Sequence, residues 1–151
     1  RYEFSGNAAD TGAAPAQDGT LTNGASIVSD ATRGPVLNLD GTDDFVDLSG
    51  SVGSVAGLTA GTIAGWIQFT GTFRTIFSVS DTADTGSYAA LFLGASGYLT
   101  FEVVENGVAQ LAVYRNSATI NDGSWHHVAV TVDGSGNRLY VDGVLASAGE
   151  L

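Results

Sequence analysis

One stretch, residues 125–143 with the sequence WHHVAVTVDGSGNRLYVDG, constrains the fold of this chain more than any other. Every second residue from 128 to 132 is a valine, which is the two-residue period of a half-buried strand. The residues DGSGN follow at 133–137, where glycine and asparagine tolerate the left-handed backbone of a turn. A second alternating run and a second Asp-Gly turn come next. The stretch therefore predicts an antiparallel β-meander with one apolar face.

Short apolar runs of the same kind recur along the rest of the chain, separated by turn residues, and no helical period interrupts them. Strands are expected at residues 2–4, 36–39, 45–48, 62–69, 74–79, 87–93, 99–104 and 109–114. The turn Asp40-Gly41-Thr42-Asp43 is expected to join two of them as a hairpin. Residues 5–26 are expected to form a long loop, and Trp66 is expected to lie in the core. The pattern predicts an all-β antiparallel sandwich or barrel with no substantial helix.

The charge of the chain excludes some partners. Sixteen acidic residues against five arginines give a formal net charge of -11, which disfavours nucleic acid and anionic membranes. No apolar run is long enough to span a bilayer, so membrane insertion is not expected. The balance suits bound cations and an extracellular or cell-surface location. Because the first residue is Arg1 rather than methionine, we expect a processed or excised piece of a longer chain.

Several motifs resemble a known family. WHHVAVTVDG followed by LYVDG resembles the signature of laminin-G-like domains of the concanavalin A-like lectin/glucanase superfamily. FSGNAAD at 4–10, DGTLTNGA at 18–25 and LDGTDDFV at 39–46 resemble successive motifs of its bacterial members, and TIAGWI at 62–67 resembles the strand after them. The resemblance implies a concanavalin A-like jelly roll of two curved sheets, formed by residues 1–151 as one domain. The fold alone assigns no function, since it hosts lectins, enzymes and adhesion modules.

The end of the sequence raises a question about completeness. In the family, further strands follow the meander and close the sandwich, whereas this sequence ends at residues 149–151. The domain is therefore expected to lack its last strands. Either the chain was cut from a longer one, or a neighbouring chain supplies the strands by pairing with the open edges. A rearranged, self-sufficient sandwich is the third alternative.

Acidic turn residues form the candidate metal site. The resemblance implies a structural Ca²⁺ in the loops near the start of the fold, and Ca²⁺ takes six to eight oxygen ligands. The expected side-chain ligands are Asp10, Asp40 and Asp43, with backbone oxygens near Asn7, and Asp44 lies in the same turn-rich region. The alternative is that these residues only form hydrogen bonds with their own turns.

Catalytic residues are not expected. His126 and His127 are adjacent, so on a strand they point to opposite faces and cannot easily bind one metal ion. Glycosidase chemistry needs two carboxylates that face each other across a sugar. Glu102 and Glu105 are three residues apart, which places them on opposite faces of a regular strand.

Aromatic and arginine side chains form the candidate glycan site. Possible platforms for a sugar ring are Phe73, Tyr88, Tyr98, Tyr114 and Trp125. An arginine can bind a carboxylate through two parallel hydrogen bonds, which suits an acidic sugar. The expected ligand-binding residues are Arg74, Tyr88 and Arg115, on the concave sheet or its rim, and the alternative for each arginine is a surface ion pair.

Together these features predict a non-catalytic glycan-binding or adhesion module of a larger secreted or surface protein. Two other hypotheses remain. The first is a structural subunit of an extracellular assembly, completed by strands from a neighbouring chain. The second is a glycoside hydrolase.

Overall fold

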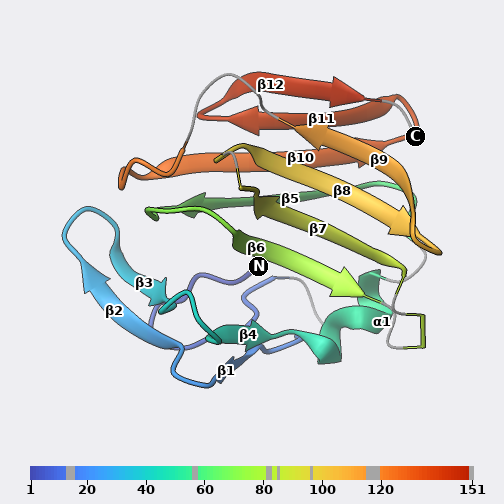
Figure 1. Ribbon diagram of the computed structural model, residues 1–151. Helices are drawn as coiled ribbons and strands as arrows, with labels where there is room; N and C mark the ends of the chain where they lie inside the picture. Colours follow the sequence, from blue (N-terminus) through green and yellow to red (C-terminus); the bar gives the residue numbers. More distant parts are fainter. Residues whose placement is uncertain are drawn as a thin grey trace. The chain divides into compact units, whose positions relative to one another are not determined.

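The computed structural model describes residues 1–12, 16–55, 58–80, 83–84, 86–95, 97–114 and 120–149. These residues form two compact units, Arg1–Leu58 and Thr59–Leu151. Each unit is a separate set of antiparallel strand pairs, and each is described by itself (Figure 1). The prediction of one domain over residues 1–151 stays a prediction.

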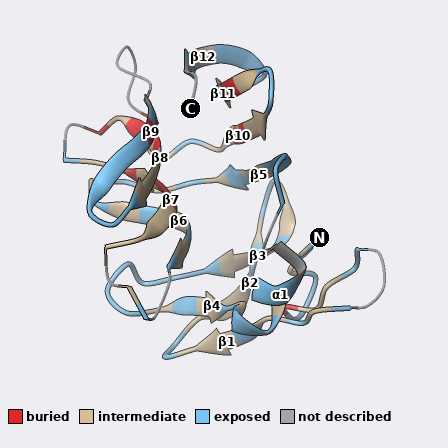
Figure 2. Ribbon diagram, turned by 90° about the vertical axis from the view of Figure 1, so that its right-hand side faces the viewer, coloured by how far each residue is buried: buried red, intermediate tan, exposed pale blue. Residues whose placement is uncertain are grey.

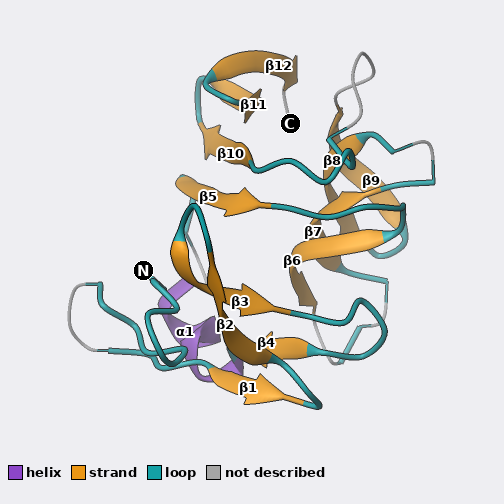
Figure 3. Ribbon diagram, turned by 90° about the vertical axis from the view of Figure 1, so that its left-hand side faces the viewer, coloured by secondary structure: helices purple, strands orange, loops and turns teal. Residues whose placement is uncertain are grey.

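The first unit contains two small antiparallel sheets and two single turns of helix. Strand β1 (Thr20–Thr22) pairs with β4 (Phe45–Asp47), and β2 (Ser26–Asp30) pairs with β3 (Gly34–Asn38). The 3-10 turn η1 (Ser49–Ser51) leads into the four-residue helix α1 (Val52–Val55), drawn in purple in Figure 3. Among the described residues, no helix has the length and apolar character needed to cross a lipid bilayer.

Local backbone geometry corrects three strand and loop predictions for this unit. Residues 2–4 form an isolated bridge from Tyr2 to Asp10 and no strand, because Phe4 has a positive φ of 53°. The predicted loop 5–26 contains β1 and the first residue of β2. The predicted hairpin across Asp40–Asp43 is also wrong, since β3 pairs with β2 and β4 pairs with β1.

The second unit contains two four-stranded antiparallel sheets. The first has the order β12-β11-β10-β5 and the second has the order β6-β7-β8-β9. The first sheet comprises β5 (Gly61–Ile67), β10 (His126–Asp133), β11 (Gly136–Val141) and β12 (Val144–Gly149). The second comprises β6 (Arg74–Ser80), β7 (Tyr88–Leu93), β8 (Leu99–Glu105) and β9 (Val108–Tyr114). The last three strands of the chain form the meander predicted from residues 125–143.

The core of the second unit lies between its two sheets. Leu91 and Leu93 from one sheet pack in the same cluster as Val128, Val130 and Leu139 from the other. All five side chains are at most 1% exposed, and Figure 2 shows buried positions on strands of both sheets. Because alternate residues of these strands face the core, their other residues form the two outer faces. The fold is an antiparallel β-sandwich of the jelly-roll class, as predicted.

Trp66 is the main error among the predicted core residues. Ile63 and Ile67 of β5 pack against the core, so Trp66 lies on the opposite parity and points away from it. Its exposed fraction is 49%. The apolar character of the strand therefore did not identify its buried face.

Candidate functional site

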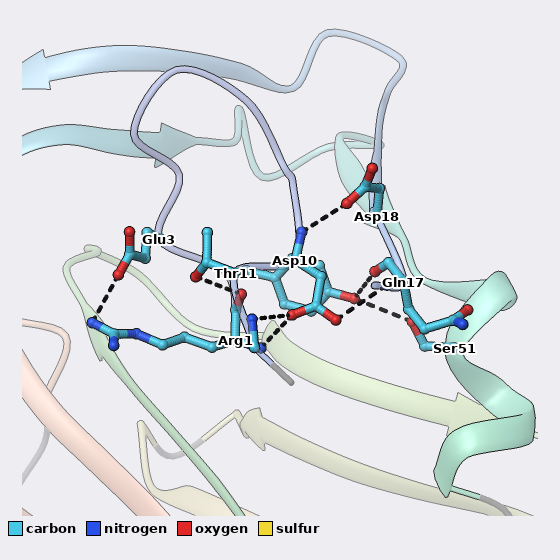
Figure 4. Close-up of polar contacts among 9 residues, drawn as sticks. Arg1, Glu3, Asp10, Thr11, Gln17, Asp18 and Ser51 are labelled. Atoms are coloured by element: carbon cyan, nitrogen blue, oxygen red, sulfur yellow. Dashed lines mark hydrogen bonds and ion pairs between the residues drawn. The ribbon is translucent and has the colours of Figure 1, made fainter. Parts of the chain in front are cut away.

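Asp10 lies in a network of nitrogen donors near the chain start (Figure 4). Its Oδ1 accepts hydrogen bonds from the Arg1 amino group at 2.8 Å and from the Gly12 N–H at 2.7 Å, and its Oδ2 accepts one from the Gln17 N–H at 3.1 Å. The Arg1 ammonium, with the two backbone N–H groups, lowers the pKa of Asp10 to about 2. Both oxygens of Asp10 therefore already have hydrogen-bond donors.

A second acidic group lies in the turn before β4. Asp40, Asp43 and Asp44 offer carboxylate oxygens that all lie within 4.8 Å of one another. The Asp44 Oδ2 accepts the Asp40 N–H at 2.9 Å, and the Asp40 Oδ1 accepts the Thr42 N–H at 2.7 Å. The hydrogen bond from Thr42 is the main cause that lowers the pKa of Asp40.

The β1–β2 turn lies directly against this acidic group. Asn23 Nδ2 donates to the Asp43 carbonyl at 2.7 Å. A Cβ atom on Gly24 would lie 2.8 Å from Asp44 Oδ1, so a larger residue there would require the Asp44 side chain to move. The structure thus brings two predicted ligands, Asp40 and Asp43, together with Asp44. Among the described residues, Asp10 is not a member of this group.

Tyr88 lies on the second unit, at the start of β7. Its hydroxyl donates to Glu102 Oε1 at 2.5 Å, and this hydrogen bond is the main cause that raises the pKa of Tyr88. Glu102 is thus engaged on the face of β8 opposite the core, while Glu105 is exposed at the end of that strand. The two glutamates do not face each other across a shared site.

The strand register separates Arg74 from Tyr88. Arg74 pairs with Leu93, whereas Tyr88 pairs with Ser80 at the other end of the same two strands. Six residues of strand rise correspond to about 20 Å. The two predicted ligand-binding residues therefore do not form one small site, and the third, Arg115, lies outside the described residues.

Phe73, the residue before Arg74, is the most exposed large apolar side chain among the described residues, at 74%. Its φ of 56° is unusual for a bulky residue and carries steric strain. Arg74 folds back over the same turn, where its Nη1 lies 3.5 Å from the Phe73 carbonyl oxygen. Among the aromatic platforms predicted from the sequence, Phe73 is thus one that the fold displays to solvent.

Residues 120–124 brace the turn that carries Phe73. Gln68 Nε2 donates to the Gly123 carbonyl and Asn121 Nδ2 donates to the Gly71 carbonyl, both at 2.8 Å. Two backbone contacts add to these, a hydrogen bond from Gly123 to Phe69 and a bridge from Thr70 to Asp122. Hydrogen bonds and a backbone bridge to residues 121–123 therefore hold residues 68–71, which lead into the strained residue Phe73.

The two histidines have separate environments. His126 Nδ1 lies 2.9 Å from Asp142 Oδ2, and His126 Nε2 lies 3.2 Å from Asp122 Oδ1. The hydrogen bond with Asp142 is the main cause that raises the pKa of His126. His127 instead contacts Trp66 in an edge-on arrangement, with ring centroids 5.3 Å apart. Sequence reasoning missed both partnerships, because Asp142 and Trp66 lie far from the histidines in the chain.

The geometry defines a jelly-roll β-sandwich, an acidic turn that contains Asp40, Asp43 and Asp44, and a second turn that exposes the Phe73 ring to solvent. The chain belongs to the concanavalin A-like lectin/glucanases superfamily, because a laminin G family model of that description matches residues 40–151. This confirms the resemblance seen in the sequence. No curated protein sequence matches the chain.

Solved structures with a similar fold include the two that follow. The mouse laminin alpha1 chain, domains LG4-5, has a TM-score of 0.53 and 22% identity, and the match covers 62% of this chain and 24% of that one. An S-layer domain-containing protein (residues 221-444) from Clostridium thermocellum ATCC 27405 has a TM-score of 0.58 and 27% identity. That match covers 89% of this chain and 62% of the other. The chain thus spans about a quarter and about three fifths of these two proteins.

Proposed function

We propose that this chain is a non-catalytic glycan-binding module that attaches a larger secreted or surface protein to its target. The laminin G family and the two structural neighbours support an extracellular adhesion or binding role. The single observation that carries the proposal is Phe73, an aromatic ring held out into solvent by a braced and strained turn. Backbone strain of this kind persists only where the surrounding structure enforces it, and it gathers at functional sites.

The side chains of this turn suit one class of sugar. An exposed ring offers an apolar face for stacking, and the neighbouring Arg74 guanidinium can bind a carboxylate with two parallel hydrogen bonds. A chain with a net charge of -11 repels polyanions. The ligand is therefore a glycan that ends in a single acidic sugar rather than a sulfated or uronic polymer. Tyr88 would join the same site only for a ligand that spans about 20 Å.

A glycan array with wild-type protein and three variants tests this function. We expect the best acidic ligand to bind at least about tenfold more weakly to Arg74→Ala and to Phe73→Gly. Phe73→Gly should fold at least as stably as wild type, because glycine adopts positive φ without steric cost.

The matched control is Arg138→Ala, which removes one cation from β11, where Arg138 lies 3.9 Å from Asp133. This variant should bind like wild type. Equal binding by all four proteins, or no acidic glycan bound by wild type, would rule out the site. Release of reducing sugar from bound glycans would favour a hydrolase instead.

We also propose that Ca²⁺ binds the acidic turn as a structural ion. Its side-chain ligands would be Asp40, Asp43 and Asp44, which replaces the predicted trio by exchanging Asp10 for Asp44. All the side-chain ligand atoms of this group are carboxylate oxygens, which suits Ca²⁺. Asp10 fits less well because nitrogen donors already engage both of its oxygens.

A structural subunit remains the second candidate function. Within the two four-stranded sheets that the described residues form, the edge strands β5, β6, β9 and β12 each pair with one neighbour only, and such edges can pair with another strand. The S-layer domain-containing protein, 27% identical, also favours this candidate. Light scattering in dilute solution separates the two functions. Strand donation predicts oligomers that grow with concentration, whereas a self-sufficient module stays a monomer, melts cooperatively and binds no apolar dye.

A further inference from the structure

The outer face of the sheet β12-β11-β10-β5 carries a regular arrangement of side chains on strands β5 and β10. In β5, Ile63 and Ile67 pack on the core, so Thr62, Ala64 and Trp66 lie on the outer face. Trp66 keeps an exposed fraction of 49% there. Among the described residues, Trp66 is the only tryptophan whose side chain is exposed.

The neighbouring strand β10 places a matching residue beside each of these three. Val128 and Val130 are buried, so His127, Ala129 and Thr131 are on the outer parity. The register pairs Trp66 with His127, Ala64 with Ala129 and Thr62 with Thr131. The face therefore has an aromatic pair at one end, a pair of alanines in the middle and a pair of threonine hydroxyls at the other end.

The aromatic pair lies next to the alanine pair along the two strands. The Trp66 and His127 rings meet edge-on at 69°, with centroids 5.3 Å apart. Methyl side chains are much shorter than these rings, so the alanine pair leaves more room above the sheet than the aromatic pair does. Tyr140 of β11 lies directly across from Ala129 and adds an aromatic residue beside the alanine pair. A flat, partly apolar ring of several ångströms fits such a surface.

We propose that Thr62, Ala64, Trp66, His127, Ala129 and Thr131, here named the Trp66 face, bind an uncharged oligosaccharide. A pyranose ring has an apolar C–H face for the indole and alanine methyl groups, and hydroxyls for the threonines. Binding sites of this type combine apolar and aromatic walls with a few placed polar groups. Charge favours an uncharged ligand, because none of the six residues is an acid, a lysine or an arginine and the chain as a whole repels polyanions.

This inference goes beyond the proposed function, since it adds a second surface and a ligand of different charge. Affinity electrophoresis tests it, with native gels that contain a soluble β-glucan, α-glucan, mannan or xylan. We expect at least one polysaccharide to retard the wild-type protein. Trp66→Ala should weaken that binding at least about tenfold, and Trp66→Phe should retain part of it.

A second variant keeps the test independent of Trp66 and of folding. Ala64→Gln puts a longer side chain in the middle of the Trp66 face and leaves the indole in place. Because Ala64 is exposed, this substitution does not change the core. It should also abolish retardation. Val108→Ala, which shortens an apolar side chain that is 61% exposed on the other sheet, should migrate like wild type.

Two results would overturn the inference. One is that no neutral polysaccharide retards the wild type, and the other is that Trp66→Ala or Ala64→Gln is retarded as strongly as wild type. Binding of acidic glycans at Arg74 is measured separately and should survive both substitutions. Failure of the Trp66 face and failure of the Phe73–Arg74 site are therefore distinguishable.

Discussion

His126 is the residue whose protonation should affect the stability of the fold. Its two ring nitrogens face the carboxylates of Asp142 and Asp122, and Asp142 also accepts the His127 N–H at 2.9 Å. Only the protonated ring can donate to both carboxylates at once. The contact therefore links the start of β10 to the turn between β11 and β12 most strongly when the imidazole is charged.

This geometry predicts a pH dependence of unfolding. The folded-state pKa of His126 is raised above its ordinary value of 6.5, so its stabilisation is fully present below pH 6.5 and is lost as pH rises through the folded-state pKa. At pH 6, His126→Gln should reduce the free energy of unfolding by about 1 kcal/mol.

Chemical denaturation from pH 5.5 to 9 measures the difference between wild type and His126→Gln. That difference should shrink as the pH rises, and His127→Gln is the matched control because His127 has a separate environment. A difference that is constant across the range would contradict the assignment.

The β2–β3 hairpin shows how a turn decides strand pairing at the scale of an element. Asp30 Oδ1 accepts the N–H groups of Thr32 and Arg33 at 2.9 and 2.8 Å, which closes the turn. Gly34 then takes a φ of 73° as β3 begins. The sequence Asp40-Gly41-Thr42-Asp43 offered an equally good turn signal, but its carboxylates bind the local backbone while β3 and β4 pair elsewhere.

Gly34 and Gly61 provide a matched test of this turn. A Cβ on either residue would meet no heavy atom within 4 Å, and only Gly34 has a positive φ. Gly34→Ala should therefore lower the free energy of unfolding by about 1 kcal/mol through backbone strain alone. Gly61→Ala should be neutral or slightly stabilising, because it restricts the unfolded chain. Denaturant midpoints measure both, and equal effects would mean that φ at Gly34 is not the cause.

At the scale of the whole molecule, Ca²⁺ should act as a stabilising ligand. An ion that binds only the folded chain raises the free energy of unfolding by about 2.7 kcal/mol at a hundredfold excess over Kd. We expect the melting temperature to rise with Ca²⁺ and to fall with a chelator. Asp43→Asn should remove this response, whereas Glu105→Gln, which loses the same charge at an exposed strand end, should keep it. Identical melting curves for the wild type with Ca²⁺ and with chelator would exclude the site.

The sequence alone determined the fold class and the meander of β10, β11 and β12. These strands are neighbours in the chain and are joined by short turns, so alternation and turn residues suffice to specify their pairing. The same local logic predicted β6 to β9 with small shifts at their ends. Asp40 and Asp43 lie close together for the same local reason, since both belong to one turn.

Only the tertiary structure decided which surfaces these strands present. Trp66 and Ile67 are both apolar, and the opposite sheet determines which parity is buried. Arg74 and Tyr88 begin adjacent strands, but antiparallel pairing sends them to opposite ends. The β1–β2 turn, about twenty residues away in the chain, contacts the acidic group through Asn23 and Gly24. Each outcome depends on contacts between distant segments, which local periodicity does not encode.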